Sequence, residues 1–401
     1  MKHHRRSFLT LVLLAAVLLA AGCSRPREAV STLDTPAHHA LRGNDFLDRG
    51  DLDNAARSFD MALSLNKEHS PALAGKAVTL AMQSAVAGKD QRRKLADSAD
   101  DFVSQARKRA KDDDERRGAL SARIRVLRLT KQPSKWLQEA EEDYQDAVKL
   151  DKRRIDPDPA FFMAQAYRDA FNLQKAGDLY REVLSMNRGR TQAADAEMAV
   201  VQKIQRAEPG SLHGKAVAFQ AALTRADISA LLVEELQLAR LYERGNTARF
   251  DTSFRAPGQG GQADQLKNIP EATDINDHAM RSDIQEVMRL KVVGLEPNAD
   301  RKFHPNEKIT RAEFALIIED VLVRVTGEQK LKTRFIGQNS PFPDVRNDAF
   351  YFNAVQTVVS RNLMEPKNRV QGIFGPQDAV AGVDALLVLR LLKDELKGMV
   401  R

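Results

Sequence analysis

The feature that most restricts the fold is a six-residue segment that occurs twice, as LTRADI at residues 223–228 and as ITRAEF at residues 309–314. In each copy a Thr precedes an acidic residue by three positions. This is the spacing of a capping box, in which the Thr hydroxyl and the carboxylate each accept a main-chain N–H at a helix start. Apolar residues at helical spacing follow both boxes: Ile228, Leu231, Leu232 and Leu236 after the first, and Phe314, Ile317, Ile318, Val321 and Leu322 after the second. The sequence therefore predicts repeated helical units.

Each box also contains an Arg, Arg225 or Arg311. A cation in the first turn faces the positive end of the helix dipole, at a cost of roughly 0.3 to 1 kcal/mol. Local stability alone therefore predicts that Ala at either position would leave the helix as stable or slightly more stable. Two interpretations explain the Arg: it holds an anion beside free helix-terminal amides, or it pairs with a carboxylate of a neighbouring repeat.

Flanking residues extend the repeat. Segments 273–275 (TDI) and 303–305 (FHP) precede the second box, and segments 342–345 (FPDV) and 374–376 (FGP) recur in a third copy. Aligning Phe374 with Phe303 places Ala381 at the Thr position and Gly382 at the Arg position, so this box keeps only Asp384. The residues resemble the S-layer homology module.

The resemblance covers residues 189–401, in copies at about 189–244, 269–327 and 340–400, with a loop at 245–268. It implies a three-repeat helical module whose grooves bind cell-wall polymer, peptidoglycan or similar, and an Arg placed at position 382 is expected to add a site. The residues that the resemblance assigns to polymer binding are Thr224, Arg225, Asp227, Thr310, Arg311, Glu313 and Asp344.

Residues 38–188 carry a different repeat. Ala55, Phe59 and Ala62 lie on one helical face, and similar faces return around Phe102, Tyr144 and Tyr180. The separation along the chain between successive aromatic residues of this set is near the period of about 34 residues of tetratricopeptide repeats. The segment resembles such an array. The resemblance implies helical hairpins in which small residues let helices approach and the aromatic side chain fills the wedge to the next pair.

A helical array of this kind implies a protein-binding concave groove. The candidate groove residues lie on the first helices of the pairs: Asn44, Asp48, Phe161, Gln165 and Arg168. The alternative is that these residues only form solvated faces.

The first residues indicate export. Basic Lys2, Arg5 and Arg6 precede an apolar run, which ends in Ala-Ala-Gly before Cys23. This order resembles the lipobox of bacterial lipoproteins, which implies a signal peptide at 1–22, a fatty-acylated (palmitate-bearing) Cys23 as the membrane anchor, and a tether at 23–37. Ser24 favours the outer membrane, facing the periplasm. The alternative is an ordinary cleaved signal with Cys23 near the cut.

Composition and missing motifs exclude several function classes. The net charge of +7 falls to +4 without the three basic residues of the signal, which is too weak and dispersed for nucleic-acid binding. A single Cys allows no internal disulfide. The eight His residues form no ligand pattern with carboxylates, and no Gly-x-Ser-x-Gly turn is present, so we expect no metal, no cofactor and no catalytic activity.

The sequence thus predicts an all-α chain, a helical-hairpin solenoid followed by a three-repeat helical module. The predicted function is that of a non-enzymatic, membrane-anchored envelope adaptor, which binds cell-wall polymer through the C-terminal module and an unknown envelope protein through the solenoid. The alternative is an assembly or secretion accessory scaffold whose C-terminal module is structural and binds no polymer. The damaged third box supports the alternative.

Overall fold

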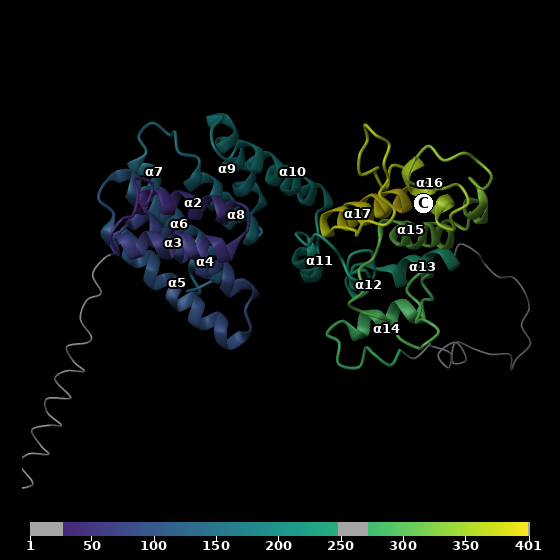
Figure 1. Cartoon of the computed structure of the whole chain (residues 1–401). Helices are drawn as coiled ribbons and strands as arrows, with labels where there is room; N and C mark the ends of the chain where they lie inside the picture. Colours follow the sequence, from purple (N-terminus) through teal and green to yellow (C-terminus); the bar gives the residue numbers. More distant parts are fainter. Residues whose placement is uncertain (1–26, 248–271, 400–401) are drawn as a thin grey trace, which may run out of the picture. The chain divides into compact units, whose positions relative to one another are not determined.

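Helical hairpins build the first part of the chain in the computed structural model, which describes residues 27–247 and 272–399 (Figure 1). Within these ranges the chain forms helices and no β-strand, only isolated bridges, so the predicted all-α class is confirmed. Two compact units divide at Met198 and Ala199. This division lies inside α10 (Thr191–Ala207), whereas the sequence analysis placed the boundary before that helix.

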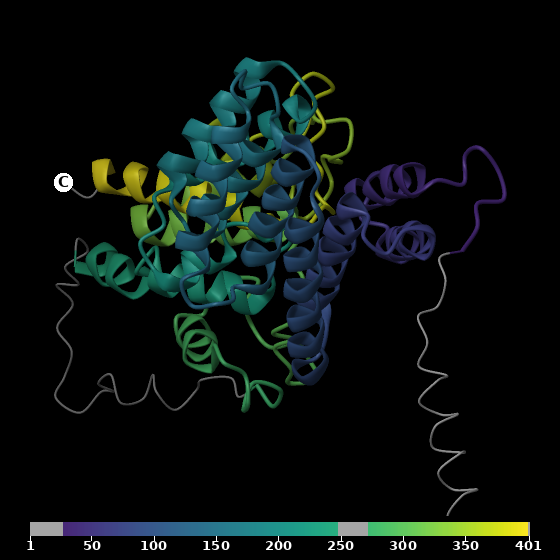
Figure 2. The same ribbon diagram turned by 90° about the vertical axis from the view of Figure 1, so that its left-hand side faces the viewer.

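The first unit is a solenoid of four helix pairs, and in each pair the second helix packs against the first. The first helices of consecutive pairs also contact one another, which forms a continuous inner layer (Figure 2). The pairs are α2 (Pro36–Asp48) with α3 (Leu52–Leu65), α4 (Ser70–Val86) with α5 (Lys89–Arg109), α6 (Asp113–Thr130) with α7 (Trp136–Leu150), and α8 (Asp158–Asp169) with α9 (Leu173–Met186).

Phe59 on α3 is the wedge between the first two pairs. Its side chain is fully buried and lies against Gly43 of α2 and Gly75 of α4. A Cβ atom at these glycines would lie 2.5 and 2.1 Å from the Phe59 ring. The predicted role of Phe59 is confirmed. Tyr180 is likewise fully buried, whereas Tyr144 is only partly buried, because its hydroxyl reaches Glu182 at the surface.

The segment before α2, predicted as part of a tether, contacts the first pair from residue 27 onward. The Arg27 N–H donates to the carbonyl of Ser64 at 2.8 Å. Asp34 is buried, and its carboxylate accepts from Arg27 at 2.6 Å and lies 2.8 Å from Nε2 of His39. The remainder of the predicted tether lies outside the described residues.

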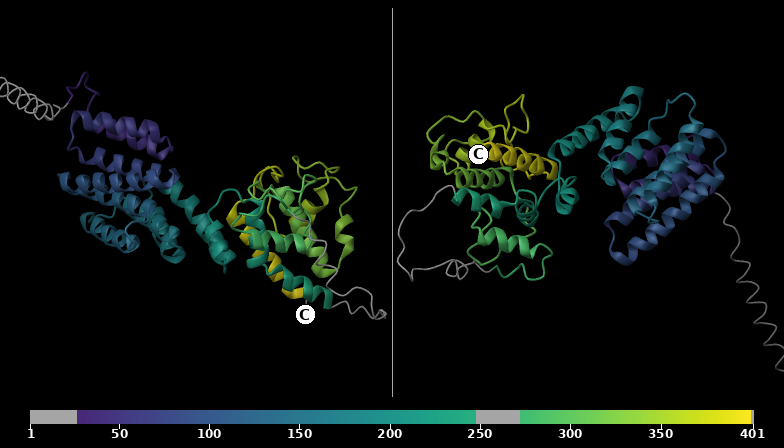
Figure 3. Two further views of the ribbon diagram at one scale, coloured as in Figure 1. Left: turned by 90° about the horizontal axis from the view of Figure 1, so that it is seen from below. Right: turned by 180° about the vertical axis from the view of Figure 1, so that it is seen from behind.

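The second unit repeats a helix, a loop and a second helix (Figure 3). The helices that start at the boxes are α12 (Arg225–Glu234), α15 (Arg311–Thr326) and α17 (Gly382–Met399). The first two pack against the helix that opens the next repeat, α14 (Arg281–Arg289) and α16 (Phe352–Ser360) respectively. The connecting helices are α11 (Leu212–Val217), α13 (Leu238–Thr247) and the 3-10 helix η2 (Gln329–Thr333).

A closed ring of main-chain hydrogen bonds joins the three repeats. The N–H of Leu223 donates to the carbonyl of Val380, that of Val380 to Ile309, and that of Ile309 back to Leu223, at 2.8, 3.0 and 3.0 Å. Each residue lies two positions before a box helix. The equivalence of the three partners establishes the predicted three-repeat arrangement.

The first copy departs from the predicted continuous helix. α12 ends at Glu234, and the chain reverses at Gln237, where φ is +54°, before α13 begins. Leu236 is still buried, as its place in the apolar pattern predicts. Most of the predicted loop at 245–268 lies outside the described residues.

Candidate functional site

Both predicted capping boxes are present. The Thr224 hydroxyl accepts from the Asp227 N–H at 3.1 Å, and the Asp227 carboxylate accepts from the Thr224 N–H at 2.9 Å. The second box repeats this exchange between Thr310 and Glu313, at 3.2 and 2.8 Å. Each acidic side chain also accepts from its Thr hydroxyl. These four side chains therefore fix the helix starts.

Arg225 connects the first repeat to the second. Its side chain is buried and donates to three main-chain carbonyls, those of Phe303 at 2.7 Å, Gly294 at 2.9 Å and Glu296 at 3.0 Å. The guanidinium lies 4.7 Å from the centre of the Phe303 ring. Burial lowers the pKa of Arg225, and nearby carboxylates led by Glu307 oppose this effect. Each of the three guanidinium nitrogens of Arg225 therefore donates to one carbonyl.

Arg311 makes the same connection to the third repeat, but one of its three guanidinium nitrogens has no acceptor. Nε donates to the Phe374 carbonyl at 2.9 Å and Nη2 to the Glu365 carbonyl at 2.6 Å, and the guanidinium lies 4.7 Å from the Phe374 ring centre. Nη1 of Arg225 donates to the Gly294 carbonyl, whereas Nη1 of Arg311 has no hydrogen-bond acceptor within the described residues. Burial lowers the pKa of Arg311, opposed by Asp384, Asp378 and Asp344.

These contacts revise the energetic expectation for the boxed arginines. Each was predicted to be neutral or unfavourable for stability, and each was given an anion or a carboxylate as its partner. The structure gives both side chains main-chain carbonyl partners from the following repeat. A buried carbonyl that loses its donor is costly, so both arginines stabilise the module.

Asp344 has a structural contact too. Its two carboxylate oxygens accept the N–H groups of Phe374 at 3.0 Å and Gly375 at 2.7 Å. Asp274 does the same one repeat earlier, for Phe303 and His304, both at 2.8 Å. Burial acts to raise the pKa of Asp274, but the amide hydrogen bonds outweigh it and the pKa is lowered. These carboxylates hold the loop against which each boxed Arg stacks.

Gly382 occupies the Arg position of the third box, as the alignment predicted. Its N–H donates to the carbonyl of Gln220, as the N–H of Arg225 donates to Glu307 and that of Arg311 to Asp378. A Cβ atom at Gly382 would lie 1.7 Å from the carbonyl oxygen of Val217. The expectation that an Arg here would add a site is therefore wrong, because the chain of the first repeat fills the space.

A cavity of about 360 Å³ opens beside Arg311. Its walls come from α10, α15, α17 and the loop that follows α16. Both apolar and charged side chains form its lining. The charged residues are Lys203, Arg206, Arg311, Glu365, Lys367, Arg369 and Asp384.

Most of these charges are paired. Lys203 lies 3.1 Å from Asp384, Lys367 lies 2.6 Å from Asp378, and Arg369 pairs with Glu365. Arg206 is exposed and has no ion-pair partner in the part of the chain that the structure describes. The cavity thus offers two donors for an anion, the Arg206 side chain and Nη1 of Arg311. Sequence reasoning missed the basic residues around Arg311, because they come from a helix and a loop with no motif of their own.

The candidate groove residues of the solenoid separate into three environments. Asn44 and Asp48 line a cavity of about 380 Å³ on the inner layer of helices. Phe161 is buried in the core, where its ring meets Phe162 and Tyr180 edge to face. It is not a groove residue.

The other two candidates face α10. Nε2 of Gln165 donates to Glu197 at 3.4 Å, and Arg168 pairs with the same carboxylate and with Asp169. Of the five predicted groove residues, only Asn44 and Asp48 on α2 therefore line the cavity of the inner layer.

Cys23 lies outside the described residues. Within residues 27–247 and 272–399, no cluster of His, Cys, Asp and Glu is suited to a metal ion. Over the same ranges no helix has the length and apolar character needed to span a membrane.

Comparison with known families identifies one segment. Residues 273–315 match the S-layer homology domain family. The match begins at the TDI segment and ends just beyond the second box, so it contains Asp274, Thr310 and Arg311. It associates the C-terminal module with the cell envelope. No curated protein and no solved structure matches the chain.

Proposed function

We propose that this chain is a non-enzymatic envelope lipoprotein that binds an anionic cell-wall polymer through its C-terminal module and a protein partner through its solenoid. The S-layer homology match at residues 273–315 supports the envelope part of this proposal. The polymer, the lipid anchor and the protein partner are the parts that experiments must test.

The observation that carries the polymer proposal is the cavity beside Arg311. It combines an apolar lining with two guanidinium groups that still have free donors. Guanidinium groups bind carboxylate and phosphate in a bidentate geometry, and apolar surface beside them suits the faces of sugar rings. The equivalent guanidinium of Arg225 has no free terminal nitrogen. Polymer binding is therefore assigned to the junction of the second and third repeats.

The solenoid supports the second part of the proposal. Its helix pairs resemble tetratricopeptide repeats in spacing and in the glycine-lined wedge around Phe59. Its inner layer carries a cavity that includes Asn44 and Asp48. Arrays of this kind present concave surfaces that bind other proteins.

A structural scaffold is the second candidate. The full set of carbonyl bonds at Arg225 and the absence of an Arg at Gly382 favour it, because two of the three repeat junctions are then built for closure alone. In this case the module would cap the solenoid, and no polymer would bind.

Sedimentation of the mature chain with purified sacculi separates these functions. One sample keeps the polymers that are covalently attached to peptidoglycan, and a second is stripped of them by acid. Binding to both samples supports peptidoglycan as the ligand, and binding to the first alone supports the attached polymer. A chain that remains in the supernatant with both samples contradicts polymer binding and favours the scaffold.

The lipid anchor is tested with Cys23→Ser in the full precursor. We expect the precursor to accumulate unprocessed and to incorporate no labelled palmitate, whereas the parent chain is labelled and fractionates with the outer membrane. A Cys23→Ser chain that is processed and stays with membranes would contradict the lipoprotein assignment.

A further inference from the structure

The segment before α2 forms a fixed loop at residues 27–35, which we call the N-terminal loop. Its centre is the buried carboxylate of Asp34, which accepts from the Arg27 side chain at 2.6 Å and from the Val30 N–H at 2.8 Å. The same carboxylate lies 2.8 Å from Nε2 of His39 on α2. The hydrogen bond from Arg27, the largest cause, holds the pKa of the Asp34 carboxyl well below its usual range. The carboxylate is therefore ionised at neutral pH, and its contacts hold the loop to α2.

The N-terminal loop lies at one end of the first helix pair. The Arg27 N–H donates to the carbonyl of Ser64, in the last turn of α3. At the other end of the loop, the Thr35 hydroxyl accepts the His38 N–H and caps α2. In Figure 2 the loop is the purple segment beyond the ends of both helices.

The loop exposes two large apolar side chains. Val30 is 83% exposed and Leu33 is 67% exposed. Single apolar side chains are common at protein surfaces and need no explanation. Here two of them lie in one short loop whose main chain is held in place, so their apolar surface stays in water at a free-energy cost. An apolar phase in contact with the loop would remove this cost.

The position of the proposed lipid anchor brings the bilayer close to this loop. Cys23 precedes Arg27 by four residues. Four residues span at most about 14 Å in any conformation, and the headgroup layer on one side of a bilayer takes about 5 to 8 Å. If Cys23 carries the lipid, the main chain at Arg27 lies within about 14 Å of the hydrocarbon boundary. Only residues 24–26 remain of the predicted tether, too few to hold the loop away from the membrane.

The charges of the loop favour an apolar contact over an electrostatic one. Arg27 pairs with Asp34 at 2.6 Å, and the other charged residue between positions 27 and 35 is Glu28. Attraction to anionic lipids needs an excess of Lys and Arg. The loop has no such excess, so Val30 and Leu33 are its means of contact with a bilayer.

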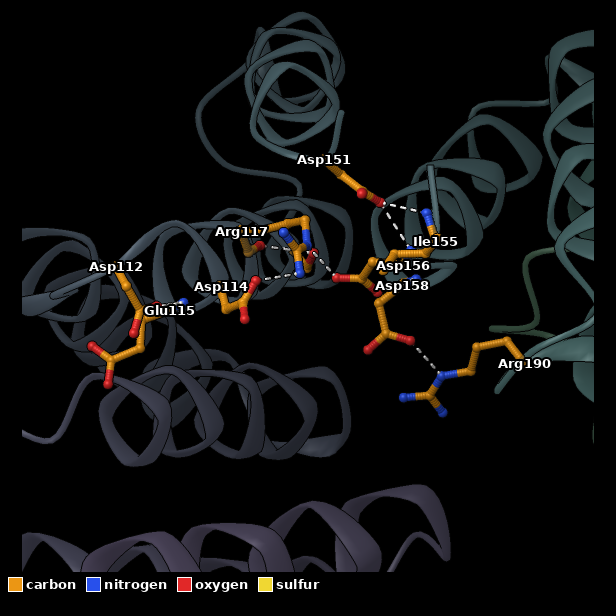
Figure 4. A network of polar contacts seen from close by, with 10 residues as sticks. Asp112, Asp114, Glu115, Arg117, Asp151, Ile155, Asp156, Asp158 and Arg190 are labelled. Atoms are coloured by element: carbon orange, nitrogen blue, oxygen red, sulfur yellow. Dashed lines mark hydrogen bonds and ion pairs between the residues drawn. The ribbon is translucent and has the colours of Figure 1, made fainter. Parts of the chain in front are cut away.

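The neighbouring turn of the solenoid limits this contact to the loop. The turn between α5 and α6 lies at the same end as the turn between α3 and α4, because Arg109 pairs with Glu68 at 2.9 Å. It leads into exposed carboxylates, among them Asp112 and Asp114, which Figure 4 shows at the start of α6. Transfer of a charged group out of water is costly. The acidic start of α6 is therefore unsuited to a bilayer, whereas the N-terminal loop is suited to it.

We propose that the N-terminal loop is a membrane-contact surface, at which Val30 and Leu33 enter the interface of the bilayer that holds the acylated Cys23. Apolar side chains enter this interface to a depth of about 5 to 10 Å when they lie on one face of a bound helix, and the same physical chemistry applies to a fixed loop. The inference rests on the proposed lipid anchor and goes beyond it, because an anchor alone does not orient the solenoid. The lipid and the two side chains together fix the first helix pair at the bilayer surface.

Fluorescent labels on the full mature chain in phosphatidylcholine vesicles test the contact. The chain has one Cys, at position 23, so in an acylated chain Val30→Cys or Leu33→Cys supplies the thiol that takes a bimane label. Val86→Cys is the matched control, because Val86 is 85% exposed and belongs to the same solenoid. It ends α4, whose length of about 25 Å separates it from the turn between α3 and α4.

Two quenchers report where each label lies, a doxyl-labelled lipid from the bilayer and iodide from water. We expect the lipid to quench the labels at positions 30 and 33 at least threefold more than the label at position 86, and iodide to quench them at least threefold less. Equal quenching at the three positions would overturn the inference. Labels at 30 and 33 that are shielded from iodide but not quenched by the lipid would also overturn it, because a second copy of the chain would then cover the loop.

Vesicle composition and a charged variant separate apolar insertion from attraction to headgroups. The quenching should be the same in phosphatidylcholine and in vesicles that contain phosphatidylglycerol. Val30→Glu should reduce lipid quenching of a label at position 33 at least twofold, whereas Val86→Glu should leave it unchanged. Quenching that occurs in anionic vesicles alone, or that survives Val30→Glu, would contradict insertion of these side chains.

The parent chain distinguishes failure of this inference from failure of the lipid anchor. A parent chain that takes up no bimane and stays with the vesicles has an acylated Cys23, and the quenching data then decide on the loop alone. A parent chain that is labelled at Cys23 and leaves the vesicles refutes the anchor, and the loop contact is refuted with it.

Discussion

The guanidinium of Arg311 lies 4.7 Å over the ring of Phe374 and donates through Nε to the carbonyl of that same residue, although the two are far apart in the chain. Arg225 and Phe303 repeat this relationship one repeat earlier. The first-turn Arg of each intact box thus links consecutive repeats through hydrogen bonds and a ring contact. The side chain of Arg311 also keeps a nitrogen without an acceptor beside a cavity, so the contact between repeats and the proposed polymer site share this residue.

Truncation of either linking Arg should lower the stability of the module. Arg225→Ala removes three hydrogen bonds to carbonyls and should lower the free energy of unfolding by about 1.5 to 3 kcal/mol. Arg311→Ala removes two and should cost less. Urea denaturation of the full chain, with the exposed Arg346→Ala as control, measures both. Unchanged stability of Arg225→Ala would restore the helix-dipole expectation.

Adding a side chain at Gly382 should destabilise the module by overpacking. Gly382→Ala places a Cβ atom 1.7 Å from the Val217 oxygen, so the junction of the third and first repeats must open. The expected cost is about 1 to 3 kcal/mol. Gly118→Ala is the control, since a Cβ there meets no atom within 4 Å. Thermal unfolding of the two variants should separate them, and equal midpoints would count against ring closure at this glycine.

Truncation of Phe59 should destabilise the solenoid. Phe59→Ala empties the wedge between α2 and α4 and should cost about 3 to 5 kcal/mol. Phe350→Ala, at a side chain that is 80% exposed, should change stability little. Differential scanning calorimetry reports both. A Phe59→Ala chain as stable as its parent would show that the core of the first pairs had been misplaced.

Glu319 predicts a pH dependence. Burial raises the pKa of this α15 side chain above its ordinary value of 4.5, although Asn353 and Thr357 donate to it. Its native state therefore holds a proton more tightly than the unfolded chain does, and stability is lost as the pH rises through the raised pKa. Glu319→Gln should gain stability over the parent as the pH rises from about 4.5 upward. Parallel stability profiles from pH 4 to 8 would contradict the shift.

Much of this fold could be predicted from local chemistry. The capping boxes and the apolar helix faces, including the one that carries Phe59, depend on residues a few positions apart, and periodicity reports those directly. The alignment of Gly382 with the boxed arginines was recoverable from Phe303 and Phe374 for the same reason.

The partners of the charged residues could not be predicted in this way. Arg225 bonds to carbonyls, which every residue carries, so the sequence offers no signal for them. Phe161 and Gln165 were both predicted as groove residues on one helix, yet Phe161 is in the core and Gln165 faces α10.

Polymer binding at the cavity beside Arg311 is the central claim, and Arg206→Ala tests it most directly. Arg206 lines that cavity, is exposed and has no ion-pair partner among the described residues, so its removal should leave stability unchanged. The measurement is the dissociation constant of the mature chain for purified sacculi, compared with that of the control Arg346→Ala. We predict a dissociation constant about tenfold higher for Arg206→Ala, with an unaltered melting temperature, which corresponds to the loss of one charged hydrogen bond. An unchanged dissociation constant for Arg206→Ala would contradict the account.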